Sequence, residues 1–110
     1  MLTVTYYSTI GNSMPSSTAR VPTTNGSRYL QQLCKHWAHK FEVEFTPEKG
    51  VVHLPEGTLA TMDATHEALD VRLEATDETV LARMKTVLAN HLDRFAFREA
   101  PLPFDWRDAA

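Results

Sequence analysis

The sequence predicts an α+β fold, a two-layer sandwich in which two helices cover one face of a mainly antiparallel sheet of about five strands. Four short segments between residues 41 and 75 alternate apolar and polar residues and are separated by short turns, as in an antiparallel meander. Two longer segments, beginning near residues 28 and 77, repeat apolar residues at helical spacing instead. The predicted order is therefore β-α-β-β-β-β-α.

The first strand and the first helix occupy residues 18–41. Residues 18–21 alternate polar and apolar side chains, Pro22 ends the strand, and Ser27 is a suitable N-cap for the helix. At about 100° per residue, the helix has an apolar side that carries Leu30, Leu33, Cys34, Trp37 and Phe41. Its polar side carries Arg28, Gln32, Lys35, His36 and His39.

The predicted meander comprises residues 41–46, 51–54, 58–64 and 69–75. One face of these strands is apolar and packs on the helices; the other faces solvent and carries Glu42, Glu44, Asp70, Arg72 and Glu74. Thr76 is the predicted N-cap of the second helix, whose apolar stripe runs from Val80 to Phe95. Residues 101–106 then alternate, but two prolines restrict them to an edge strand or a docking arm.

Length and composition limit the kind of protein. The 110 residues suit a single α+β domain over residues 14–106, with a mobile N-terminal extension at 1–13 and a C-terminal tail at 107–110. A formal charge of -3 argues against nucleic acid as a partner. The single cysteine cannot form an intramolecular disulfide, and the sequence has neither a signal peptide nor a membrane-spanning run. We therefore expect a cytoplasmic protein that does not bind membranes.

The residues able to carry chemistry divide into two groups. Cys34 lies about 140–160° around the helix from His36 and His39, so one metal ion cannot bind all three. His36 and His39 are about 60° apart and could share a ligand or a metal, flanked by Arg28 and Lys35. His91 falls within the apolar stripe of the second helix. It is either a core histidine bonded to a carbonyl or, with Cys34, part of a pocket between the layers.

Several segments together resemble a known family. These are S-T-A-R-V-P-T at 17–23, S-R-Y-L at 27–30, L-C-K-H-W-A-H-K at 33–40, G-T at 57–58 and H-L-D-R-F-A-F-R-E at 91–99. They resemble the bacterial domain of unknown function 2218, and the resemblance covers about residues 14–106. The family resembles a module joined to siderophore-interacting flavin reductases, which implies a link to iron or siderophore handling. It assigns no role to the matching residues Arg28, Cys34, Lys35, His36, His39, His91 and Arg94.

These observations favour a small binding or accessory protein without catalytic activity and without a resident cofactor. Its working surface would be Arg28, Lys35, His36 and His39, joined by Arg94 and Arg98 if the helices run side by side. Such a surface attracts an anionic small molecule or a protein partner with an acidic surface. Two alternatives stay open. One is a metal-binding protein or metalloenzyme that uses His36 and His39, and the other is a homodimeric interaction module built on the sheet face or the 102–106 arm.

Overall fold

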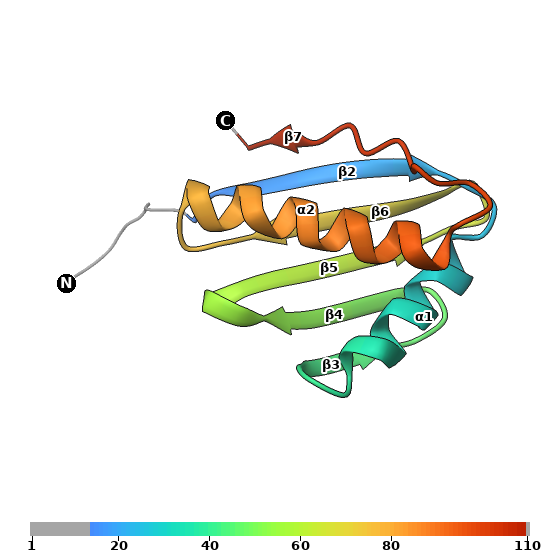
Figure 1. The fold of residues 1–110 in the computed structure, drawn as a ribbon, viewed down its shortest axis with the longest axis horizontal. Helices are drawn as coiled ribbons and strands as arrows, with labels where there is room; N and C mark the ends of the chain where they lie inside the picture. The colour runs from blue at the N-terminus through green and yellow to red at the C-terminus, as the bar shows by residue number, and fades with distance from the viewer. Residues whose placement is uncertain (1–13, 110) are drawn as a thin grey trace.

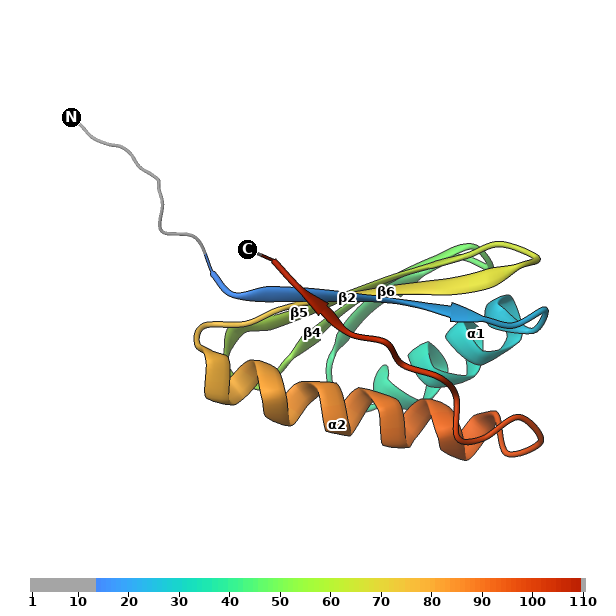
Figure 2. The same cartoon turned by 90° about the horizontal axis from the view of Figure 1, so that it is seen from above.

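The computed structural model describes residues 14–109, in which two helices pack on one face of a six-stranded antiparallel sheet. Figure 2 shows both helices on the same side of the sheet. Helix α1 packs mainly on β3 and β4, and α2 packs on β5 and β6. The predicted α+β class is confirmed, and the sheet has one strand more than expected. The N-terminal extension predicted at residues 1–13 lies outside the described residues.

The elements follow one another in the order strand, helix, four strands, helix, strand (Figure 1). The strands are β2 (Ser16–Pro22), β3 (Glu42–Phe45), β4 (Lys49–Leu54), β5 (Thr58–Ala64), β6 (Ala68–Glu74) and β7 (Arg107–Asp108). The helices are α1 (Gly26–Trp37) and α2 (Glu78–Phe95), with a short 3-10 turn at Pro55–Gly57. In the sheet the strands lie in the order β3-β4-β5-β6-β2-β7, so the first strand pairs with the last strand of the meander.

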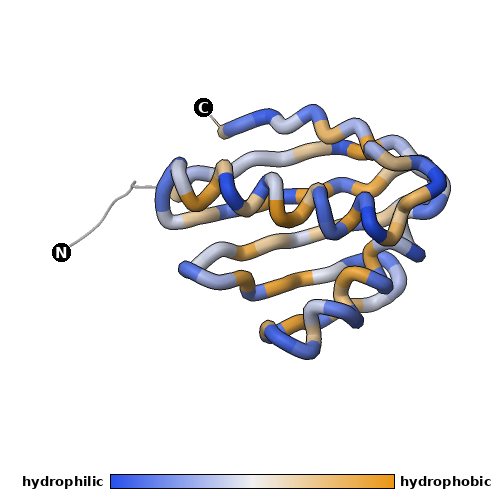
Figure 3. Tube along the Cα trace, viewed as in Figure 1, coloured by the Kyte–Doolittle hydropathy of each residue, from blue (hydrophilic) through white to orange (hydrophobic). Residues whose placement is uncertain are grey.

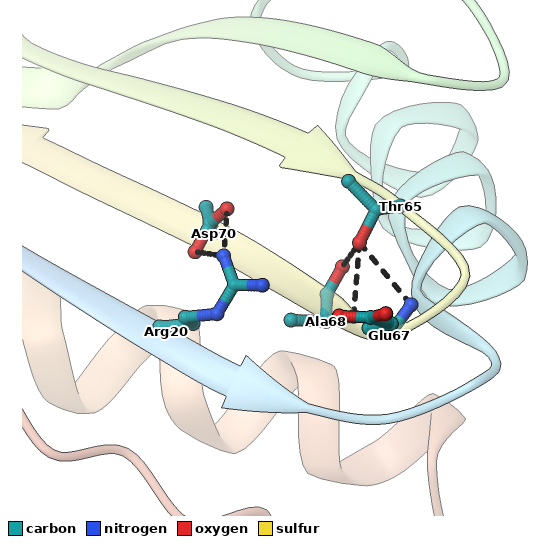
Figure 4. Close-up of polar contacts among 5 residues, drawn as sticks. All are labelled: Arg20, Thr65, Glu67, Ala68 and Asp70. Carbon is teal, nitrogen blue, oxygen red and sulfur yellow. Dashed lines mark hydrogen bonds and ion pairs between the residues drawn. The ribbon is translucent and has the colours of Figure 1, made fainter.

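The turns of the meander are tighter than the sequence indicates. Strand β4 begins at Lys49 and β6 at Ala68, inside the predicted turns 47–50 and 65–68. Between β5 and β6, the hydroxyl of Thr65 accepts hydrogen bonds from the amides of Glu67 (3.2 Å) and Ala68 (3.1 Å), as Figure 4 shows. A side chain that satisfies the turn's own amides lets both neighbouring strands extend further.

Both predicted helix caps are wrong by one or two residues. Asn25 is the N-cap residue of α1 and makes no side-chain capping bond; its side-chain amide donates to Glu99 at 3.1 Å instead. The predicted cap Ser27 donates its hydroxyl to the Pro47 carbonyl at 2.6 Å. In α2 the cap is Asp77 rather than Thr76, and its carboxylate accepts from the Val80 amide at 2.9 Å. An aspartate at this position also suits the positive end of the helix dipole.

The core lies between the helices and the inner face of the sheet. Helix α1 contributes its predicted apolar side, and Leu30, Leu33, Cys34 and Trp37 are all buried. Strands β5 and β6 alternate as the sequence predicts, with Ala60, Met62 and Val71 pointing inward. Hydrophobic and hydrophilic residues are interspersed along the helices and strands (Figure 3). None of the helices within residues 14–109 is both long and apolar enough to cross a lipid bilayer.

The C-terminal arm packs on its own domain. Leu102 is buried, and its amide donates to the Asp93 carboxylate of α2 at 2.9 Å. Beyond it, the rings of Phe104 and Trp106 stack with centroids 5.5 Å apart against the core. The arm then becomes β7, which pairs with β2, so Arg107 and Asp108 belong to the sheet rather than to the predicted tail. An ion pair between Lys85 and Asp108 (2.7 Å) joins α2 to this last strand.

Candidate functional site

The polar side of α1 faces away from the sheet and carries a row of ligand-capable side chains. Arg28, Gln32 and His36 are spaced four residues apart, so they lie in line along the helix surface. Arg28 and His39 are exposed, and His36 is half-buried. Lys35 is exposed and adjoins this row. Three of the six residues predicted for the working surface therefore come from this helix, and His39 lies in the turn directly after it.

The end of α2 lies beside this row. The ring of His36 is 5.9 Å from the ring of Phe95, centroid to centroid, and meets it edge-on. Arg94 and Arg98 are exposed where α2 ends and the following loop begins. The two helices thus meet near the C-terminal end of α2, the part that carries Arg94, and do not run side by side along their length (Figure 1).

His91 links the two helices. Its Nδ1 lies 2.7 Å from the Val87 carbonyl oxygen, so it donates to that carbonyl and its Nε2 remains free. The predicted bond to a carbonyl is thus present. The ring also lies 5.2 Å from the ring of Trp37 and 5.9 Å from that of His36, between centroids. The half-buried position of His91 therefore brings a second imidazole to the polar side of α1.

The environment of His36 disfavours the charged form of its imidazole. Burial lowers the pKa of His36 from its ordinary value, and the positive charges of His91, Lys40, Arg94 and His39 lower it further. These neighbours come from both helices and from the turn after α1. Positively charged groups of both helices therefore lie close enough to His36 to lower its pKa.

Unpaired cations are concentrated at this place. Of the 11 lysines and arginines, six form ion pairs: Arg20, Lys49, Arg72, Arg83, Lys85 and Arg107. The remaining five have no ion-pair partner in residues 14–109: Arg28, Lys35, Lys40, Arg94 and Arg98. All five lie on α1, in the turn after it, or at the end of α2. We call these five, with His36 and His39, the cationic face.

The outer face of the sheet is also charged, and several of its charges are paired. Arg20 binds Asp70 at 2.9 Å across neighbouring strands (Figure 4), and Lys49 binds Asp63 at 2.8 Å. A hollow of about 340 Å³ on this face is lined in part by Arg20, Asp63 and Asp70. Because these charges already compensate one another, an ionic ligand would have to displace existing bonds there. The cationic face carries no such competing pairs.

A cavity of about 270 Å³ opens between the two helices at one end of the cationic face. Its lining comes from the first half of α1 and from the end of α2 and the loop after it: Arg28, Tyr29, Gln32, Phe95, Phe97 and Arg98. Phe97 is 71 % exposed, the largest exposure among the large apolar side chains of the described chain. The Arg98 guanidinium stands over the Phe97 ring, 5.6 Å from its centroid.

The nearest acid to this cavity is held by other groups. Glu99 accepts hydrogen bonds from the hydroxyls of Thr23 (3.0 Å) and Tyr29 and from the Asn25 amide (3.1 Å). The hydrogen bond from Tyr29 is the main reason that the pKa of Glu99 is lowered, so the carboxylate stays ionised. Both its oxygens are occupied on the side where α1 begins. The positive charge of Arg28 also helps to lower the pKa of Glu99, while its own hydrogen bond goes to the Asn25 side-chain oxygen at 3.4 Å.

Cys34 belongs to the core and not to this surface. Its side chain is fully buried, and burial raises the pKa of the thiol to about 11. The thiolate, which is the reactive form, is therefore scarce at neutral pH. The pocket predicted to combine Cys34 with His91 would need a buried thiol that a ligand cannot reach from the cationic face.

Comparison with known proteins identifies the family of this small α+β protein. Residues 18–107 match the family described as an uncharacterized protein conserved in bacteria, DUF2218, and the chain belongs to it. A search of curated proteins finds no match. Among solved structures, the chain is similar to the NMR structure of PA4090 from Pseudomonas aeruginosa. The two share 37% identity and a TM-score of 0.70, over 86% of this chain and 95% of the other.

Sequence reasoning missed three contributors to the site: Lys40, Phe97 and the Glu99 cluster. The sequence did contain a signal for the cationic face. All 14 acidic residues lie at or after Glu42, so residues 1–41 contain none that could neutralise Arg28, Lys35 or Lys40 locally. Phe97 was harder to find. Helix α2 ends at Phe95, two residues before it, and only that termination turns the Phe97 ring out to solvent.

Proposed function

We propose that this protein is a non-catalytic binding protein whose cationic face receives an anionic small molecule. The single observation that carries the proposal is that the five lysines and arginines without an ion-pair partner in residues 14–109 all lie on α1, in the turn after it, or near the end of α2, in a chain of net charge -3. Unpaired cations repel one another, and a bound anion relieves that repulsion. An acidic surface of a partner protein would satisfy the same charges, and the experiment below can distinguish the two.

Binding fits the arrangement better than catalysis does. In residues 14–109 no histidine is hydrogen-bonded to a carboxylate, so the orienting partner of a general base is missing there. The buried Cys34 thiol has a raised pKa and is a poor nucleophile. The single cysteine supports the cytoplasm as the compartment in which this binding takes place.

The family resemblance suggests which anion to try first. It implies a link to iron or siderophore handling, and ferric chelates with several carboxylates are anions. The probe we would use is gallium(III) citrate, in which gallium replaces ferric iron without paramagnetic broadening. It would be titrated into ¹⁵N-labelled protein while backbone amide shifts are followed.

We expect shift changes confined to α1, the turn after it and the end of α2, with an affinity that falls as salt is added. Arg94→Gln and the double variant His36→Ala/His39→Ala should each weaken binding by about threefold to tenfold, the loss expected for one exposed charge contact. Binding should also raise the depressed pKa of His36, which the Cε1 proton reports. The matched control for Arg94→Gln is Arg83→Gln, which removes from the same helix, α2, a cation that is ion-paired with Glu56.

Shift changes on the outer sheet face, or an equal loss in Arg83→Gln, would contradict the proposed surface. Binding of a poly-glutamate peptide but of no small anion would show that the face receives a protein instead.

Metal binding is a second candidate function, favoured by the 5.9 Å separation of the His36 and His91 rings. Imidazoles from two helices at this separation can reach one zinc ion. The positive charges of Lys40 and Arg94 around His36 oppose a cation, and residues 14–109 contain no group of three or more suitable side chains. Elemental analysis of untagged protein after zinc addition tests this function. Stoichiometric zinc that is lost in His91→Ala would support it.

A further inference from the structure

We infer that the cavity between α1 and the end of α2 takes a carboxylate carried on a single aromatic ring. This inference rests on the proposed function, because it names the class of anion and its seat within the cationic face. Three features of the cavity carry it: two guanidinium groups without carboxylate partners, two phenylalanine rings, and a small volume.

The two arginines supply the recognition of a carboxylate. Arg28 and Arg98 enter the cavity from different elements, and neither has an ion-pair partner in the described part of the chain. A guanidinium binds a carboxylate through parallel N–H donors in its own plane. The Arg98 guanidinium carbon lies 5.6 Å from the Phe97 ring centroid, and within residues 14–109 no side chain forms an ion pair with this guanidinium. Gln32 also lines the cavity and adds a neutral donor and acceptor.

The two phenylalanines require that the anion has an apolar, planar part. Phe95 is half-buried beside His36, whereas the Phe97 ring is 71 % exposed. Covering an exposed ring with another ring removes apolar surface from water and adds a favourable ring–ring contact. Inorganic phosphate or citrate would satisfy the arginines but leave this ring in solvent.

The volume limits the size of the ligand. The cavity has about 270 Å³, below the range of about 300–1,000 Å³ typical of sites for drug-sized ligands. One ring with one or two carboxylates fits within this volume.

The experiment compares benzoate with cyclohexanecarboxylate and inorganic phosphate, each titrated into ¹⁵N-labelled full-length protein. Benzoate and cyclohexanecarboxylate have the same charge and similar size, but only benzoate has an aromatic face. We expect benzoate to shift the amides of Gln32, Phe97 and Arg98 and to bind about fivefold to tenfold more tightly than cyclohexanecarboxylate, the gain expected from one aromatic pair.

Four variants separate the contributions. Arg28→Gln and Arg98→Gln should each weaken benzoate by about tenfold, as expected for loss of a charge-assisted hydrogen bond. Phe97→Leu keeps an apolar side chain and should abolish only the preference for benzoate over cyclohexanecarboxylate. Arg94→Gln removes a cation of the same face that does not line the cavity, so it should weaken benzoate far less than Arg28→Gln does.

The outcomes also distinguish this inference from the proposed function. Equal affinity for the two carboxylates, tighter binding of phosphate, or an equal effect of Arg94→Gln and Arg28→Gln would overturn the aromatic cavity while leaving anion binding by the cationic face intact. Failure of every anion to bind would overturn both.

Discussion

At the residue scale, one carboxylate connects distant parts of the chain. Glu99 follows α2, yet its three hydrogen-bonding partners Thr23, Asn25 and Tyr29 lie in the loop before α1 and in its first turn. They hold the loop that carries Phe97 and Arg98 against the start of α1. The cavity between the helices therefore depends on Glu99, although this residue does not line it.

Glu99→Ala should lower the free energy of unfolding by about 1–2 kcal/mol, because it removes several hydrogen bonds to a charged but solvent-exposed acceptor. The lowered pKa of Glu99 also gives the effect a pH dependence. Protons bind more readily to the unfolded chain, so this stabilisation is present above the ordinary glutamate pKa of about 4.3 and is lost as the pH falls below it.

Urea unfolding of the wild type and Glu99→Ala at pH 7 and at pH 3 measures both effects. The difference between the two proteins should shrink at pH 3. A difference that is the same at both pH values would contradict the role of the ionised carboxylate.

At the element scale, the contact between α1 and β4 depends on a residue without a side chain. Gly50 of β4 lies under Cys34 of α1, and a Cβ at position 50 would come within 2.9 Å of the Cys34 sulfur. The same atom would be 3.4 Å from the Leu30 Cδ2. Alanine is therefore too large for this position in a close-packed core.

Gly50→Ala should destabilise the protein by about 1–3 kcal/mol through overpacking. Cys34→Ala removes the sulfur that the new methyl group would meet, so the double variant should be less destabilised than the sum of the two single variants. A double-mutant cycle by urea unfolding measures this coupling. Strict additivity would show that the clash is relieved elsewhere, for example at Leu30.

At the scale of the whole molecule, the two faces of the sandwich differ in how their charges are arranged. On the outer sheet face every lysine or arginine of the strands β2, β4 and β6 is ion-paired, as Arg20 is with Asp70. The helical face carries five cations without ion-pair partners in residues 14–109. The net charge of -3 hides this asymmetry, because most acids lie on the sheet, its turns and α2. An anionic partner would be attracted to the helical face by these cations.

Local periodicity was sufficient to predict most of the fold. The alternation along β5 and β6 and the apolar side of α1 depend only on residues a few positions apart, and burial follows both. The predicted separation of Cys34 from the histidines is consistent with the buried thiol and the exposed His39. Helix ends were predicted less well, since Ser27 bonds to Pro47, a residue 20 positions away.

By itself, therefore, the sequence determined the α+β class, the two helices and which side of each faces the core, because these follow from repeats of two and 3.6 residues. Only the tertiary structure decided that β7 pairs with β2, that His91 meets His36, and that Arg28 and Arg98 share a cavity. Each of these depends on the distance between segments far apart in the chain. That distance is set by how the layers pack together.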